Sequence, residues 1–157
     1  MLICKKIMTT VIFTSNISSR DDIITKLLDE YSNENEMPKI YHYSDFEGTD
    51  LLAEQSSSIQ ISPLDLLRMY WMTDRITEKI LYFVELFEKK TAKELEKIIK
   101  FNRYHNITSV IIIAAPHDIS PITRMSVRRV YCTDVDNIYD RAIDTLFRRA
   151  KIYRQKG

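Results

Sequence analysis

Short runs of apolar and β-branched residues alternate along this chain with helix-like stretches, and this alternation restricts the fold more than any other feature. The clearest strand patterns are M-T-T-V-I-F-T at residues 8–14, K-I-L-Y-F-V-E-L-F at 79–87 and I-T-S-V-I-I-I-A-A at 107–115. The second is nearly continuously apolar, which is typical of a strand covered on both faces, and the third is the most β-prone segment. Weaker patterns predict strands at residues 39–44 and 127–132.

Amphipathic helices are predicted between these strands, at residues 18–32, 62–78, 91–101 and 136–150. Ser18 or Ser19 can cap the first helix, with Asp21 and Asp22 in its first turn. The T-A-K-E segment at residues 91–94 has the form of a capping box for the third helix. Residues 45–58, which are acidic and contain several serines, are expected to form a loop.

The resulting order, βαβαβαββα, predicts one α/β domain over residues 1–157. It is expected to be a three-layer sandwich with a mostly parallel central sheet, whose ligands bind at the carboxyl ends of the strands. The longest apolar run, residues 110–115, is far shorter than the roughly 20 residues that span a bilayer. Because the first residues also lack the pattern of a signal peptide, we expect an intracellular, cytoplasmic protein that makes no contact with membranes.

Charge is distributed unevenly between the two halves of the chain. Residues 1–88 hold 8 Lys+Arg against 15 Asp+Glu, a net charge of −7, whereas residues 89–157 hold 15 against 7, a net charge of +8. Such an asymmetry is typical of contact with nucleic acid or with an oppositely charged protein, including a second copy of the same chain. A surface that is merely solvated is the alternative explanation.

The basic half contains arginines that are well placed to bind phosphate groups. The predicted contacts are Arg103, Arg124, Arg128, Arg129, Arg148 and Arg149, and further cations of the last helix and tail are Arg141, Lys151, Arg154 and Lys156. Such a surface would bind DNA or RNA without sequence preference and with a steep dependence on salt. The alternative is a homo-oligomer or another protein partner, held through faces of opposite charge.

Glu85 interrupts an otherwise apolar strand, and a buried carboxylate is costly unless it is paired or bound to a metal. Together with Glu88, and with Asp21 or Asp45 from a neighbouring strand edge, it could hold Mg²⁺ and support phosphodiester hydrolysis. The alternative is an ion pair between Glu85 and an arginine or lysine. The three histidines are scattered and the two cysteines lie in unrelated contexts, so no metal site is predicted on them.

Residues 99–124 resemble part of the HerA/FtsK superfamily of DNA-pumping ATPases, especially the packaging ATPases of large DNA viruses. The similar positions are Arg103, His105, Asn106 and Ile107, then the strand at residues 110–113, then Arg124. The resemblance implies a P-loop-NTPase-like topology, in which residues 79–87, with Glu85 and Glu88, correspond to the Walker B strand. Residues 8–14 would then lead into the phosphate loop.

The catalytic groups of that family are replaced here. A phosphate loop needs glycines, a lysine and a hydroxyl, but the corresponding stretch is T-S-N-I-S-S-R-D, at residues 14–21, without any glycine. Ser19, Arg20 and Arg124 are the remaining candidates for binding a phosphate group. The polar sensor expected after the next strand is replaced by Ala114 and Ala115.

Two functions follow from these patterns. The first is a non-hydrolysing, packaging-ATPase-like protein of viral origin, which binds nucleic acid or a protein partner in the host cytoplasm or the virion and needs no cofactor. The second is a nuclease that acts on DNA through Mg²⁺ held at Glu85 and Glu88. The surroundings of Glu85 distinguish them, since converging carboxylates favour the nuclease and a buried ion pair favours the binding protein.

Overall fold

Seven parallel strands form the centre of the molecule, which we describe from a computed structural model over residues 7–32, 38–46, 51–52, 58–72, 79–100, 107–133 and 137–155. The strands are β1 (Met8–Thr14), β2 (Lys39–Ser44), β3 (Ile59–Gln60), β4 (Ile80–Glu85), β5 (Ile107–Ile113), β6 (Val127–Thr133) and β7 (Lys151–Gln155). Their order in the sheet is β3-β2-β4-β5-β1-β6-β7, and each pairing is parallel. The predicted α/β class with a largely parallel sheet is therefore confirmed.

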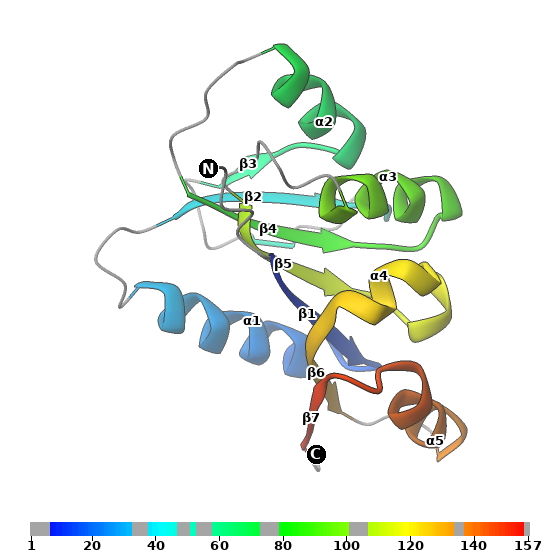
Figure 1. Cartoon of the computed structure of the whole chain (residues 1–157). Coiled ribbons are helices and arrows are strands. Elements are labelled where there is room, and N and C mark those ends of the chain that lie inside the picture. The colour runs from blue at the N-terminus through cyan, green and yellow to red at the C-terminus, as the bar shows by residue number, and fades with distance from the viewer. Residues whose placement is uncertain are drawn as a thin grey trace, which may run out of the picture.

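Helices cover both faces of the sheet. They are α1 (Ile17–Ser32), α2 (Pro63–Met72), α3 (Lys89–Lys100), α4 (Pro121–Ser126) and α5 (Asn137–Leu146). Figure 1 shows α1 on one side of the sheet and α3, α4 and α5 on the other. This division follows from the direction of the connections, because right-handed crossovers that run in opposite directions along a sheet lie on opposite faces. The chain runs one way from β1 to β2 and the other way from β3 onward.

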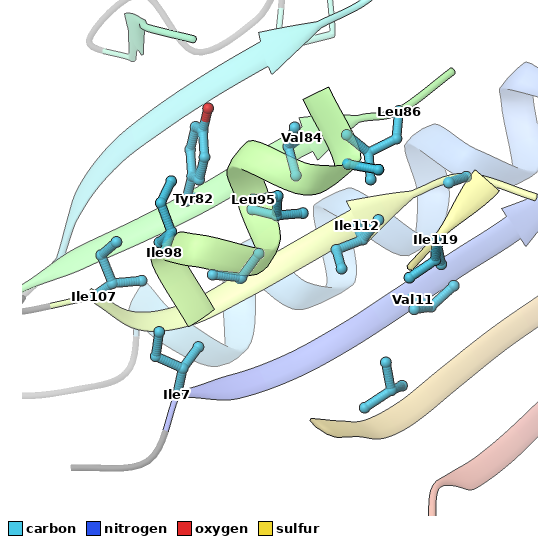
Figure 2. Close-up of a cluster of buried hydrophobic side chains, with 14 of the residues drawn as sticks. Ile7, Val11, Tyr82, Val84, Leu86, Leu95, Ile98, Ile107, Ile112 and Ile119 are labelled. Atoms are coloured by element: carbon cyan, nitrogen blue, oxygen red, sulfur yellow. The ribbon is translucent and has the colours of Figure 1, made fainter. Parts of the chain in front are cut away.

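The larger core lies on the face of the sheet that α3 covers, between the sheet and the helices of that face. Leu95 and Ile98 of α3 pack there against Tyr82 and Val84 of β4 and Ile112 of β5 (Figure 2). The smaller core lies on the opposite face, where α1 inserts Ile23, Ile24 and Leu27, and where Ile12, Leu81, Phe83 and Ile111 belong to the sheet. Each residue of β4 is buried, as its apolar sequence predicts. No helix in the described ranges is long and apolar enough to cross a membrane.

The predicted helix caps at two positions are wrong. α1 begins at Ile17, and its N-terminal cap is Asn16, whose side-chain oxygen accepts a hydrogen bond from the Ser18 amide at 2.8 Å. α3 begins at Lys89, two residues before the predicted capping box, and Thr91 lies inside its first turn. α1 starts early because a side chain outside the expected motif, that of Asn16, satisfies one of its first amide groups.

The C-terminal segment also differs from its prediction. The last helix ends at Leu146 instead of residue 150, and residues 151–155 form the strand β7, which continues the sheet beside β6. Arg148 and Arg149 therefore lie in the turn before β7, not on a helical face. The short elements β3 and α4 were also not predicted. Residues 73–78, the expected end of the second helix, lie outside the described residues.

Candidate functional site

The parallel sheet separates the predicted site residues into two groups. Because all strands run in one direction, their carboxyl ends form one edge of the sheet and their amino ends the other. Arg20 and Glu85 lie at the carboxyl edge, where α1 begins and β4 ends. Most of the basic residues lie at the amino edge, near the starts of β6 and β7.

At the carboxyl edge, Arg20 and Glu85 form a buried ion pair. Nη1 of Arg20 donates a hydrogen bond to Oε2 of Glu85 at 3.2 Å, and the two side chains are 10% and 11% exposed. The residues are 65 positions apart in the sequence, and the crossover from β1 to α1 brings them together above the end of β4. The carboxylate that interrupts an apolar strand is thus neutralised by an arginine at the start of the helix that packs on that strand.

Neighbouring groups satisfy the rest of this pair. Oε1 of Glu85 accepts a hydrogen bond from the Ser44 hydroxyl at 2.5 Å, and Nε and Nη2 of Arg20 donate to Oδ1 of Asp21 at 3.2 and 3.1 Å. The guanidinium group therefore already contacts two carboxylates. A phosphate group at this place would be repelled by both carboxylates, so the arrangement does not favour the predicted role of Arg20 as an anion ligand.

The other acidic residues of this edge have a structural role. Asp45 accepts hydrogen bonds from the amides of Phe87 and Glu88 at 2.8 and 3.0 Å and from the Thr91 hydroxyl at 2.6 Å, so its carboxylate caps α3. The pKa of Tyr43 reports the negative charge at this edge. Burial raises this pKa most, and the negative charges of Asp45 and Glu88 raise it further. Among the described residues, no three side chains of His, Cys, Asp or Glu are arranged to hold a metal ion.

The remaining residues of the family resemblance are not assembled around Arg20. Ser19 is half-buried in the first turn of α1, whereas Arg124 belongs to α4, on the other face of the sheet (Figure 1). Ala114 continues β5, and its amide donates to the Ile12 carbonyl at 3.2 Å. Residues 101–106, which include Arg103, His105 and Asn106, lie outside the described part of the chain.

At the amino edge, five cations form what we call the amino-edge basic surface: Arg124, Arg128, Arg148, Arg149 and Lys151. Arg128 is the extra residue of a β-bulge, since Thr9 and Thr10 of β1 align with Val127 and Arg129 of β6. Arg128, Arg148, Arg149 and Lys151 are exposed, and Arg124 is half-buried. In the described parts of the chain, none of the five contacts a carboxylate.

Arg129 lies outside this surface although its neighbour belongs to it. Nη1 of Arg129 contacts Oε2 of Glu30 in α1 at 3.1 Å, and Nε donates to the Thr10 hydroxyl at 3.3 Å. Burial alone would lower the pKa of Arg129, but the hydrogen bond to Glu30 and other nearby negative charge outweigh it, and the pKa is raised. This arginine joins β6 to α1 and is engaged before any ligand arrives.

Comparisons of the chain with protein-family models, with curated protein sequences and with solved structures gave no significant match.

Proposed function

We propose that this protein is a non-hydrolysing binding and assembly protein with an ATPase-like fold, which holds nucleic acid without sequence preference at the amino-edge basic surface. The observation that carries the proposal is the arrangement of Arg124, Arg128, Arg148, Arg149 and Lys151, which come from α4, the β6 bulge, the turn before β7 and the first position of β7. Cations that lack a carboxylate partner can neutralise phosphates and release their counterions.

The carboxyl edge supports binding rather than hydrolysis. The family resemblance aligns β1 with the strand that leads into a phosphate loop and β4 with the strand that carries the Walker B acids. Here the helix after β1 contributes Arg20 and the end of β4 contributes Glu85, and these two side chains pair with each other. The ion pair takes the place where the resemblance would put a phosphate and its metal ion, which favours a protein that does not turn over ATP.

The same proposal includes a viral origin, a role in DNA packaging, and a location in the host cytoplasm or the virion. These parts derive from the family resemblance alone. The acidic carboxyl edge also gives the basic surface a second potential ligand, namely another copy of the chain. We favour nucleic acid, because the five cations come from successive elements at the amino edge of the sheet and repeated phosphates can contact them in succession.

The experiment measures binding to a fluorescent 20-base-pair DNA duplex by anisotropy over a series of salt concentrations. Each lost phosphate contact should reduce the slope of log K against log salt by about 0.9. The triple variant Arg128→Ala, Arg148→Ala, Arg149→Ala is therefore expected to weaken binding and to flatten the slope by roughly two to three.

The matched control is Lys89→Ala, Lys90→Ala, Lys93→Ala. It removes three exposed charges from the start of α3, which lies at the carboxyl edge of the sheet, opposite the amino-edge basic surface. It should retain the wild-type slope, since these lysines lie outside that surface. Equal slopes for the two triple variants would contradict the proposal. Light scattering at low salt tests the protein-partner alternative, which predicts self-association that the Arg triple variant abolishes.

A further inference from the structure

Two tyrosine rings stack on each other at the side of the sheet formed by its last two strands, β6 and β7. Tyr131 of β6 and Tyr153 of β7 are directly opposite each other in the strand register, with ring centroids 4.7 Å apart and planes inclined by 11°. Tyr131 is buried and Tyr153 is half-buried. The stack lies on the face that α1 covers, and both rings pack against the smaller core.

The position of β7 puts the outer side of this stack at the edge of the sheet. Among the described strands, β7 is the last in the sheet and pairs with β6 alone. One ring face of Tyr153 is against Tyr131, so the other face points away from β6, beyond the edge of the sheet. Of the described helices, only α1 packs on this face, and its buried residues belong to the smaller core. Figure 1 shows α1 on this side of the sheet.

Cations accompany the stack on both sides. The Lys26 ammonium group of α1 lies 5.9 Å from the centre of the Tyr131 ring, and that of Lys151 lies 5.1 Å from the centre of the Tyr153 ring. Lys151 also belongs to the amino-edge basic surface, and Arg149 and Arg148 lie two and three residues before it. Lys151 and Tyr153 are two residues apart on one strand, about 7 Å. The outer face of the Tyr153 ring, over which the Lys151 ammonium group lies, therefore adjoins the amino-edge basic surface.

We propose that Tyr153 is a stacking platform for a base of single-stranded nucleic acid whose phosphates lie on the amino-edge basic surface. A single strand can turn an unpaired base onto the outer face of the ring, whereas a duplex keeps its bases inside the helix. Lys151 is exposed, and in this proposal its ammonium group leaves the ring for a phosphate when the base arrives. This inference rests on the proposed function and specifies which form of nucleic acid the site prefers.

The test compares two fluorescent oligonucleotides of 12 positions, one of thymidines and one in which each position is abasic. They carry the same phosphates and differ only in their bases. Wild-type protein is expected to bind the thymidine strand roughly 5- to 20-fold more tightly, the range expected for stacking one or two bases on an aromatic ring. Tyr153→Leu is expected to bind both strands equally, with the affinity of wild type for the abasic strand.

Two variants serve as controls. Tyr153→Phe retains the ring and should keep the preference for thymidines. Phe87→Leu removes an exposed ring at the carboxyl edge, 60% exposed and paired with Phe46, and should also keep it. The abasic strand reports folding, because its affinity depends on the basic surface alone.

The outcomes separate this inference from the proposed function. If wild type binds both strands with equal affinity, or if Tyr153→Leu keeps the preference, stacking on Tyr153 is overturned while the phosphate-binding surface stands. If neither strand binds at low salt, the proposed function fails and this inference fails with it.

Discussion

Arg20 and Glu85 are joined by a contact of 3.2 Å between groups that are almost fully buried, at the point where α1 begins and β4 ends. The pair connects the helix on one face of the sheet to the end of a central strand. A buried ion pair contributes little net free energy by itself, but removing one partner leaves the other charge without compensation. Its consequences for stability can therefore be measured by deleting one charge at a time.

Glu85→Gln is expected to lower the free energy of unfolding by about 3 kcal/mol, because Arg20 loses its deepest partner and keeps only the more exposed Asp21. Urea unfolding at pH 7 measures this change. Glu88→Gln is the control, since Glu88 is exposed, and it should cost no more than about 0.5 kcal/mol.

The same variant tests the nuclease alternative. A metal-binding Glu85 predicts that Glu85→Gln keeps its stability in the presence of a chelator and loses Mg²⁺-dependent cleavage of linear duplex DNA. That pair of results would overturn the proposed binding function in favour of the nuclease. We expect the opposite pair, a loss of stability and no cleavage by the wild-type protein.

ATP is expected to bind weakly or not at all. The stretch at residues 14–21 has no glycine to wrap a phosphate, Asn16 already accepts the Ser18 amide at the start of α1, and Arg20 is held by two carboxylates. Titration calorimetry with MgATP should give no measurable heat of binding at 1 mM ligand. This result corresponds to a dissociation constant above 1 mM, or a binding free energy of about −4 kcal/mol or weaker. Micromolar affinity together with turnover would contradict both this prediction and the proposed function.

The central strands could be predicted because their own residues determine their environment. β4 and β5 are apolar on both faces, and a segment of that kind must lie inside a covered sheet. β7 could not be predicted in the same way. Its sequence K-I-Y-R-Q alternates between the two faces of the sheet, but it follows the apolar repeat of α5 with only a short turn between them. The alternating pattern of an edge strand identifies it only when the neighbouring strand, here β6, is known.

The candidate site shows a similar division. The sequence marked Glu85 as unusual and Arg20 as a potential anion ligand, but it could not indicate that the two are partners. Their contact depends on the strand order, in which β5 alone separates β1, and the helix that follows it, from β4, and no local pattern encodes that order. The stack of Tyr131 on Tyr153 was missed for the same reason, because it requires the register between β6 and β7.

Asp45→Ala is expected to destabilise the protein by about 1–2 kcal/mol, because the amides of Phe87 and Glu88 lose a charged acceptor at the start of α3. Chemical denaturation measures the loss, and hydrogen exchange of these two amides should accelerate. Asp22→Ala removes an exposed carboxylate from α1 and should change stability by less than about 0.5 kcal/mol. Equal effects of the two substitutions would show that Asp45 is not a cap.

Tyr82→Phe tests how the buried phenol group of Tyr82, in the larger core, affects the free energy of unfolding and its dependence on pH. The Tyr82 hydroxyl donates a hydrogen bond to the Ile61 carbonyl at 2.7 Å, and burial first, then nearby negative charge, raises the pKa of Tyr82 well above 10.0. In the unfolded chain this phenol ionises near pH 10, whereas in the folded protein it stays protonated. Its contribution to stability is therefore complete below about pH 10 and is lost as the pH rises toward the folded pKa.

The expected result has two parts. At pH 7 the variant should be less stable by about 1 kcal/mol, because the Ile61 carbonyl loses its donor. Above pH 10, the stability of wild type should decrease by up to about 1.4 kcal/mol per pH unit more steeply than that of Tyr82→Phe, so the two curves approach each other. Urea unfolding between pH 7 and pH 11 gives both values. Curves that stay parallel above pH 10 would mean that Tyr82 ionises with equal ease in the folded and unfolded states, and that its burial leaves its pKa unchanged.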